Sequence, residues 1–168
     1  GGSGDFAAGR GRSVTEQLAE AKALVAGKLP KRMPYGCVAY FQAYTGTYGS
    51  VSKLEAMFLE AMEDREVEAL SIATRPDCLP EETVSLLSRL SRRKPVWIEL
   101  GLQTAIPETA AFIRRGYPLS CFTEARKKLF LAGIPVIAHV ILGLPGEGRE
   151  EVLQTVDYLN EQKVEGIK

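Results

Sequence analysis

Glu99 and Gln103 are the first residues whose type and position point to chemistry. They lie in VWIELGLQT, where β-branched and aromatic residues predict a strand. Alternation along that strand places Glu99, Gly101 and Gln103 on one face. Because an unpaired carboxylate is costly to bury, Glu99 needs either a basic partner or a polar ligand. We therefore expect Glu99 to pair with Arg75 or another nearby arginine, or to bind a ligand.

His139 is the only histidine of the chain and lies in the apolar stretch IPVIAHVILGL. Strand alternation places it on the same face as Ile141 and Gly143, so it projects with the glycine turn that follows. A lone histidine in a strand is most often a hydrogen-bonded structural residue. The alternative is that Glu99 and His139 act as an acid and a base.

The elements that position these residues repeat along the chain. Strands are predicted to start near residues 36, 68, 95, 135 and 165, with one or two helices in every gap. Strand-helix-strand units form parallel sheets with right-handed crossovers, and apolar strands indicate a sheet that helices cover. The pattern predicts an α/β fold, and it leaves open whether the sheet is doubly wound, a barrel or a partial barrel.

Helices are predicted from apolar spacing and from capping signals. The first begins at the capping box of Ser13 and Glu16, and helices at 80–93, 107–115 and 120–133 follow later in the chain. Two others have a defined inward face. The expected inward residues are Leu54, Phe58, Ala61 and Met62 in the second helix, and Val152, Val156 and Leu159 in the helix at 150–162.

Polar or glycine-rich residues follow four of the strands. These segments are FQAYTGTYG (41–49), SIATRPDC (71–78), IELGLQT (98–104) and HVILGLPGE (139–147). In a parallel sheet the loops at the carboxyl ends of the strands meet at one edge, where helix amino-termini also point. We expect the functional site at this edge.

Composition is that of one folded domain, with 45% hydrophobic and 25% charged residues in 168. Twenty-one basic residues balance 21 acidic ones, so no overall charge favours nucleic acid or an anionic membrane. No apolar run approaches the roughly 20 residues of a membrane span, and no signal segment is recognised.

The odd, widely spaced set of Cys37, Cys78 and Cys121 is typical of free thiols. We expect a soluble, cytoplasmic protein.

The first residues, GGSG, have the composition of a linker, but the DFAAGRG that follows does not. A phosphate-binding loop is excluded because the lysine and the hydroxyl residue of that motif are absent. The chain starts within a loop and stops within a predicted strand. We therefore expect a fragment of a larger domain that is incomplete at both ends.

Six motifs in order resemble those of one family. GGSGDFAAGR, AYFQAYTGTYG, SIATRPDCL, IELGLQTA, RRGY and HVILGLPGE are similar to segments of radical S-adenosylmethionine proteins of the YhcC-like group. This group is related to oxygen-independent coproporphyrinogen III oxidase and to the Elongator catalytic subunit. The resemblance covers essentially the whole chain. It implies a partial TIM barrel and a radical enzyme with two cofactors, S-adenosylmethionine and a [4Fe-4S] cluster.

The resemblance also implies that the cluster cysteines lie just upstream of GGSGDFAAGR, outside this chain, so that the fragment alone is inactive. It places the methionine amino group near 42–47, and the ribose and carboxylate near Glu99 and Gln103. The loop after the fifth strand of the family would border adenine, and relatives often carry aspartate where this chain has His139. The cofactor-binding residues implied in this way are Gln42, Tyr44, Thr45, Gly46, Glu99, Gln103, Arg115, His139, Ile141, Gly143 and Pro145.

Two other functions stay open. A conventional TIM-barrel lyase or isomerase would use Glu99 and His139 as acid and base, and it would require a closed barrel. An RNA-binding module, suggested by the Elongator likeness, would require a contiguous basic patch. Its candidate members are the arginines at 89, 92, 93, 114 and 115.

Overall fold

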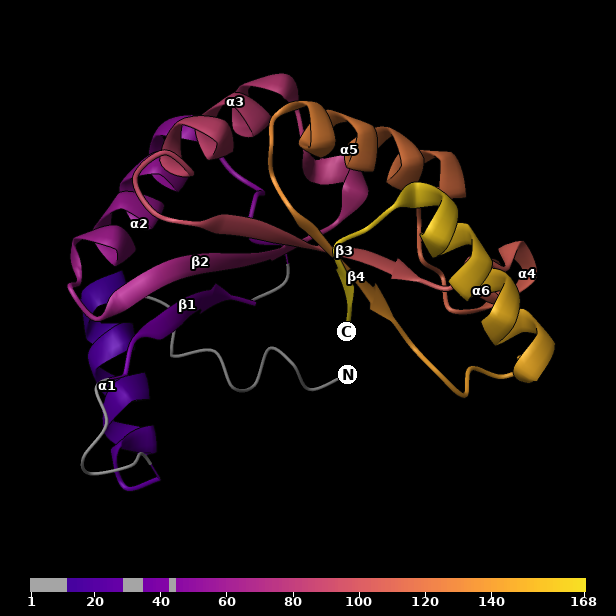
Figure 1. Cartoon of the computed structure of the whole chain (residues 1–168), viewed down its shortest axis with the longest axis horizontal. Helices are drawn as coiled ribbons and strands as arrows, with labels where there is room; N and C mark the ends of the chain where they lie inside the picture. Colours follow the sequence, from indigo (N-terminus) through magenta and orange to yellow (C-terminus); the bar gives the residue numbers. More distant parts are fainter. Residues whose placement is uncertain (1–11, 29–34, 43–44) are drawn as a thin grey trace.

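Five parallel strands form one open, curved sheet (Figure 1). The structure is a computed structural model that describes residues 12–28, 35–42 and 45–168. The strands follow one another across the sheet in chain order, with β1 and β5 at its edges. This confirms the predicted α/β fold and identifies the sheet as part of a barrel. The strands are β1 (Cys37–Phe41), β2 (Val67–Thr74), β3 (Val96–Gln103), β4 (Val136–Val140) and β5 (Gly166–Ile167).

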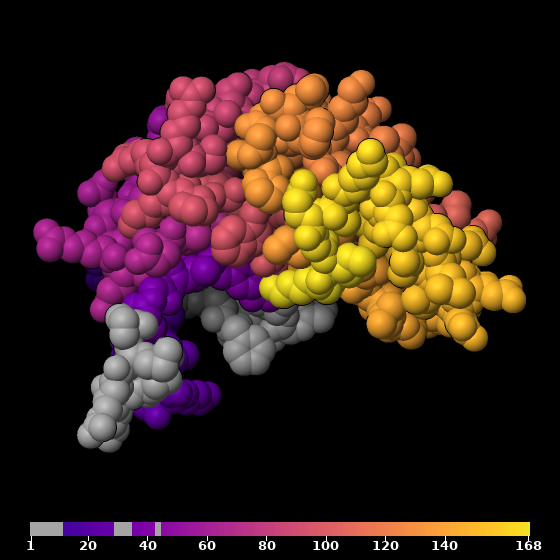
Figure 2. Space-filling view, in the orientation of Figure 1, coloured from indigo at the N-terminus to yellow at the C-terminus, as the bar shows by residue number. Residues whose placement is uncertain are grey.

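Most of the helices arch over the convex side of the sheet, and the concave side faces away from them, whereas the helix at 14–26 lies beside one end of the sheet (Figure 1). Figure 2 shows α6 in yellow beside α5 in orange, where Thr123 and Tyr158 are joined by a hydrogen bond of 2.9 Å. A short 3₁₀ helix, η2 (Pro76–Cys78), was not predicted. The α-helices are α1 (Val14–Ala26), α2 (Val51–Glu63), α3 (Glu81–Leu90), α4 (Pro107–Phe112), α5 (Leu119–Leu131) and α6 (Arg149–Gln162).

Alternation along the strands separates an apolar face from a mixed face. Phe41 of β1 meets Phe58 of α2 edge to face, with 5.0 Å between ring centroids, and this identifies the helix-facing side. The strand register then carries that side across the sheet through Ile72, Ile98 and Val136, all fully buried. The intervening residues point to the concave side. The core therefore lies between the sheet and its helices, and within the described residues no helix covers the concave face.

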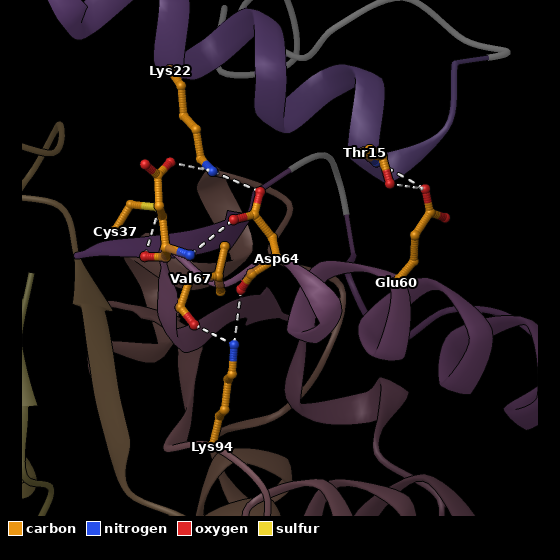
Figure 3. A network of polar contacts seen from close by, with 8 residues as sticks. Thr15, Lys22, Cys37, Glu60, Asp64, Val67 and Lys94 are labelled. Atoms are coloured by element: carbon orange, nitrogen blue, oxygen red, sulfur yellow. Dashed lines mark hydrogen bonds and ion pairs between the residues drawn. The ribbon is translucent and has the colours of Figure 1, made fainter.

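Helix α1 is attached mainly through polar contacts at the edge of the sheet where the strands begin. None of its residues is buried, although Val14 and Leu18 pack against the core. Lys22 contacts Asp64 at 2.6 Å and Glu66 at 2.7 Å, and Glu60 accepts two hydrogen bonds from Thr15 (Figure 3). These contacts fix α1 against α2 and the turn that leads into β2.

The predicted inward face of α2 is confirmed, since all four residues predicted for it are buried. In α6 the prediction was wrong for Val156, which is 36% exposed because Thr155 takes the inward position. Strand β4 is shorter than predicted because glycines with positive φ, Gly143 and Gly146, turn the chain after it.

Among the described residues, no helix has the length and apolarity needed to cross a membrane.

Removing the ring of Phe58 tests where the core lies. Phe58 is fully buried, so we expect Phe58→Ala to lower the free energy of unfolding by about 3–5 kcal/mol in urea titrations. Phe112→Ala is the matched control because Phe112 is 67% exposed, and its effect should stay within about 0.5 kcal/mol. Equal losses for the two variants would contradict the assignment of the core.

Candidate functional site

Polar side chains from neighbouring strands meet on the concave face around Glu99. The carboxylate is 93% buried as a side chain, and both of its oxygens have partners. Ser71 of β2 donates to Oε1 at 2.7 Å. Lys168, directly after β5, donates to Oε2 at 2.9 Å, and His139 Nε2 lies 2.5 Å from the same oxygen. We call Tyr40, Ser71, Glu99, His139 and Lys168 the Glu99 cluster.

Tyr40 joins the cluster from β1 through the amine of Lys168. Nζ donates to the Tyr40 hydroxyl at 3.1 Å and lies 4.2 Å from the centre of the tyrosine ring. The cluster thus connects β1, β2, β3, β4 and the residue that follows β5. Since these strands are otherwise joined only to their neighbours, the cluster ties the two edges of the open sheet together across its concave face.

These contacts keep Glu99 ionised. Burial by itself would raise the pKa of the carboxyl, but hydrogen bonds from Ser71, Lys168 and His139, together with the nearby Tyr40 hydroxyl, outweigh it and lower the pKa from about 4.5 to about 2. A carboxylate of this kind is an acceptor only. The Nε2 atom of His139 must therefore carry the hydrogen of this bond.

The expected partner of Glu99 was wrong in one respect, because none of the arginines that the structure describes contacts it. Arg75 instead forms a bidentate pair with Asp77, at 2.9 and 2.6 Å. The two residues are only two positions apart in the turn after β2, so this local pair forms without the ordering that a distant one requires. The positive charge beside Glu99 comes from Lys168, far along the sequence.

Arg115 is the most deeply buried arginine at the rim where the strands end. Its guanidinium donates to the carbonyl oxygens of Leu102, Thr104 and Tyr117, at 3.1, 2.7 and 3.1 Å. The guanidinium groups of Arg115 and Arg75 both contact the ring of Tyr117. The central carbon of each lies 5.1 Å from the centre of that ring. Among the described residues, no carboxylate pairs with Arg115. The rim therefore holds a buried cation without a counter-charge.

Gln103 ends β3 in a strained conformation on the same rim. Its φ of 68° lies in the left-handed region, and a bulge separates it from Gly101 in the pairing with β4. A Cβ added at Gly101 would lie 3.0 Å from the Gln103 amide nitrogen and 3.1 Å from the Tyr117 hydroxyl. Strain of this kind is often found at functional sites. The bare backbone at Gly101 accommodates the Gln103 amide and the Tyr117 hydroxyl.

The loop after β4 carries the predicted residues Ile141, Gly143 and Pro145, all exposed. Its first residue is fixed by a hydrogen bond from the Ile141 N–H to the Gln103 carbonyl at 2.9 Å. Its last is fixed by Glu147, which accepts a short hydrogen bond from Thr104. The loop therefore stands next to Gln103, with its backbone accessible.

The predicted turn after β1 is only partly within the described residues. Tyr44 lies outside them, whereas Gln42 is exposed and Thr45 and Gly46 are half-buried. The Gly46 N–H donates to the Ala73 carbonyl at 2.8 Å, and an added Cβ would meet that oxygen at 2.9 Å. Close approach to the end of β2 accounts for a glycine here.

The three cysteines are free thiols, as predicted, and all are half-buried. Cys78 and Cys121 line a cavity of about 750 Å³ formed by η2, α5 and the turn at 47–49. Burial, and for both thiols the nearby Asp77, raises their pKa. Among the described residues, no group of three or more histidine, cysteine or acidic side chains is placed to hold a metal ion.

The arginines proposed for RNA binding do not form one patch. Arg89 on α3 pairs with Glu55, and Arg93 in the turn between α3 and β3 pairs with Glu63. Arg114 and Arg115 follow the other end of that strand, and Arg115 is buried.

The lyase or isomerase alternative meets one of its two conditions. Glu99 and His139 are in contact, but the sheet is open.

Sequence reasoning missed Tyr40, Ser71 and Lys168 as members of the cluster. Alternation in β2 would have placed Ser71 on the same face as Ala69 and Ala73, but a serine alone gave no reason to select it. Tyr40 and Lys168 are separated by 128 residues, and no pattern in the sequence links them.

The family model described as "Radical SAM superfamily" matches residues 5–159 of the chain. YtqA of Bacillus subtilis is 40% identical over 168 residues, covering 99% of this chain and 51% of YtqA. YhcC of Escherichia coli is 40% identical over 158 residues, covering 94% of this chain and 49% of YhcC. The chain thus spans about half the length of the curated relatives it matches.

Solved structures share the fold. Elp3 of the archaeon Methanocaldococcus infernus superposes with a TM-score of 0.65 at 19% identity, covering 84% of this chain and 36% of Elp3. The radical S-adenosylmethionine methyltransferase TsrM of Kitasatospora setae, with tryptophan and a cofactor analogue bound, superposes with a TM-score of 0.59 at 16% identity. That match covers 93% of this chain and 29% of TsrM.

The ionised state of Glu99 can be tested by the pH dependence of stability. Its lowered pKa means that ionised Glu99 stabilises the fold above about pH 4.5, and that this stabilisation is lost as the pH falls toward 2. We expect Glu99→Gln to cost about 1–3 kcal/mol at neutral pH in urea titrations. The difference from the original protein should shrink in acid.

Glu124→Gln is the matched control, because Glu124 is exposed on α5 and makes none of these contacts. A gap between the original protein and Glu99→Gln that stays constant down to the lowest accessible pH would contradict an ionised Glu99.

Proposed function

Because the chain belongs to the radical S-adenosylmethionine superfamily, we propose that it forms the S-adenosylmethionine-binding core of a radical enzyme. When bound, the cofactor and a [4Fe-4S] cluster together supply a 5'-deoxyadenosyl radical that abstracts hydrogen from a substrate. The observation that carries the proposal is Arg115, a buried cation at the rim with no carboxylate partner among the described residues. An anionic ligand group would balance its charge.

The donor groups at the rim suit the three parts of S-adenosylmethionine. Arg115 would hold the carboxylate, since guanidinium groups bind carboxylates strongly. Gln103, whose amide lies over the bare backbone of Gly101, would reach a ribose hydroxyl or the same carboxylate. The exposed backbone of the loop at 141–145 would border adenine. Such a mixture of apolar surface and a few placed polar groups is typical of nucleoside sites.

Glu99 has a different role in this proposal from the one that the family resemblance implies. Both of its oxygens already have partners within the cluster, so a ribose hydroxyl could bind it only by displacing one. Removing a partner from a buried carboxylate is unfavourable. We assign Glu99 to organising the concave face, and we leave the ribose to Gln103 and the rim.

The described residues do not supply ligands for the cluster. We propose that its cysteines lie ahead of this segment in a protein of about the length of YtqA and YhcC. This chain would then position the cofactor and shield it from water, and the cluster would carry the electron. Further substrate-binding elements would lie in the other half of that protein.

The test uses the full-length protein, reconstituted with iron and sulfide without oxygen. We expect it to absorb in the charge-transfer region of a [4Fe-4S] cluster and to release 5'-deoxyadenosine from S-adenosylmethionine after reduction. A protein that incorporates the cluster but neither binds nor cleaves S-adenosylmethionine would contradict the proposal.

Shortening one rim side chain tests the cofactor site directly. Asparagine tolerates the left-handed conformation of residue 103, so Gln103→Asn should keep the fold while withdrawing the amide. We expect about tenfold weaker binding of S-adenosylmethionine in equilibrium dialysis, which corresponds to about 1.4 kcal/mol. Gln154→Asn, at an exposed position on α6, is the matched control. Unchanged affinity in Gln103→Asn would remove Gln103 from the site.

A further inference from the structure

We propose that His139 is a base that takes a proton from a molecule bound on the concave face, and that Glu99 is its positioning residue. The assignment concerns the imidazole side chain, which projects from β4 into the hollow of the sheet, and not the backbone that would border adenine. That the bound molecule is the substrate of a radical reaction rests on the proposed function. The existence of the base does not.

The bond to Glu99 determines which ring nitrogen is basic. Glu99 is ionised and can only accept, so the hydrogen lies on Nε2, and in the neutral ring Nδ1 keeps its lone pair. Among the described residues, none forms a hydrogen bond with Nδ1. The side chain is 28% exposed, so a bound molecule can reach it.

The side chain of His139 is only partly covered on the concave side. Its register partner on β3 is Gly101, where the Gln103 amide and the Tyr117 hydroxyl lie in the place that a side chain would take. On the other side the chain continues from β5 to Lys168, whose side chain is 52% exposed. The charged and titratable groups that face the imidazole are Glu99 from β3, Lys168 after β5 and, through Lys168, Tyr40 from β1.

The same groups provide for the charges that proton transfer creates. A polar X–H group of the bound molecule would give its proton to Nδ1, and its electron pair would stay on X. The imidazolium formed would keep its Nε2–H bonded to the Glu99 carboxylate, which compensates the new positive charge. Lys168 contacts the same carboxylate oxygen and offers a cation to the anion left on X. No oxidant or reductant takes part.

This arrangement selects a ligand with an ionisable N–H or O–H group. That group would lie beside Nδ1 of His139, where Lys168 can stabilise the anion that forms. Histidine at 139 gives the concave face an acceptor that is neutral before the proton transfer and a cation after it.

A single histidine makes the proposal directly measurable. With histidine labelled with ¹⁵N at both ring positions, the chain gives one set of ring signals. We expect Nε2 to carry a hydrogen, and in the neutral form of the ring we expect Nδ1 to be the unprotonated nitrogen. Glu99→Gln should populate the other tautomer, because an amide can donate to Nε2 as well as accept from it. Glu124→Gln should leave the spectrum unchanged.

A ring protonated at Nδ1 in the original protein would overturn the proposal, as would a tautomer that does not respond to Glu99→Gln. Either result would mean that Glu99 does not position the imidazole.

A second measurement separates a substrate base from a cofactor contact. Diethyl pyrocarbonate acylates an accessible, unprotonated imidazole nitrogen, and the product is followed by its ultraviolet absorbance. In the reconstituted full-length protein, saturating S-adenosylmethionine should leave the rate at His139 unchanged, with the modified residue identified by peptide mass. Complete protection by S-adenosylmethionine would overturn the proposal and make the side chain a cofactor contact.

Equilibrium dialysis of S-adenosylmethionine, run in parallel, distinguishes the two proposals. If the cofactor does not bind, the proposed function fails, and the tautomer and acylation rate measured on this chain alone still decide whether His139 is an available base.

Discussion

The concave face of this half-barrel depends on one buried negative charge. A carboxylate as enclosed as Glu99 is stable only because it receives hydrogen bonds from Ser71, His139 and Lys168. These partners come from β2, β4 and the residue after β5, so satisfying the charge also fixes the curvature of an open sheet. A closed barrel would obtain that curvature from pairing its edge strands. Here side chains across the hollow contribute to it.

The separation of the two faces explains how one sheet serves both stability and function. Apolar residues such as Ile72 and Ile98 fill the convex side against the helices. The alternate positions are then free to carry polar groups without weakening the core. At the rim this freedom extends to the backbone, where Gln103 accepts a left-handed conformation and Arg115 is buried against carbonyl oxygens. The site is built from positions that the core does not need.

Local patterns predicted much of this fold, and contacts between distant residues account for what they missed. The apolar spacing of α2 identified its buried residues because helix periodicity is a local property. The partner of Glu99 was wrong because a near neighbour, Asp77, takes Arg75, while Lys168 arrives from 69 positions away. Val156 was expected inward, yet Thr155 occupies that place. Only the family resemblance suggested the cofactors, since no residue pattern by itself distinguishes a nucleoside site.

The most direct test of the account is a crystal structure of the full-length protein, grown without oxygen in the presence of S-adenosylmethionine. The account predicts the methionine carboxylate at Arg115, the adenosyl group between Gln103 and the loop at 141–145, and Glu99 still bonded to His139 and Lys168. S-adenosylmethionine bound away from the carboxyl ends of the strands would contradict it, as would ribose hydroxyls that displace His139 from Glu99.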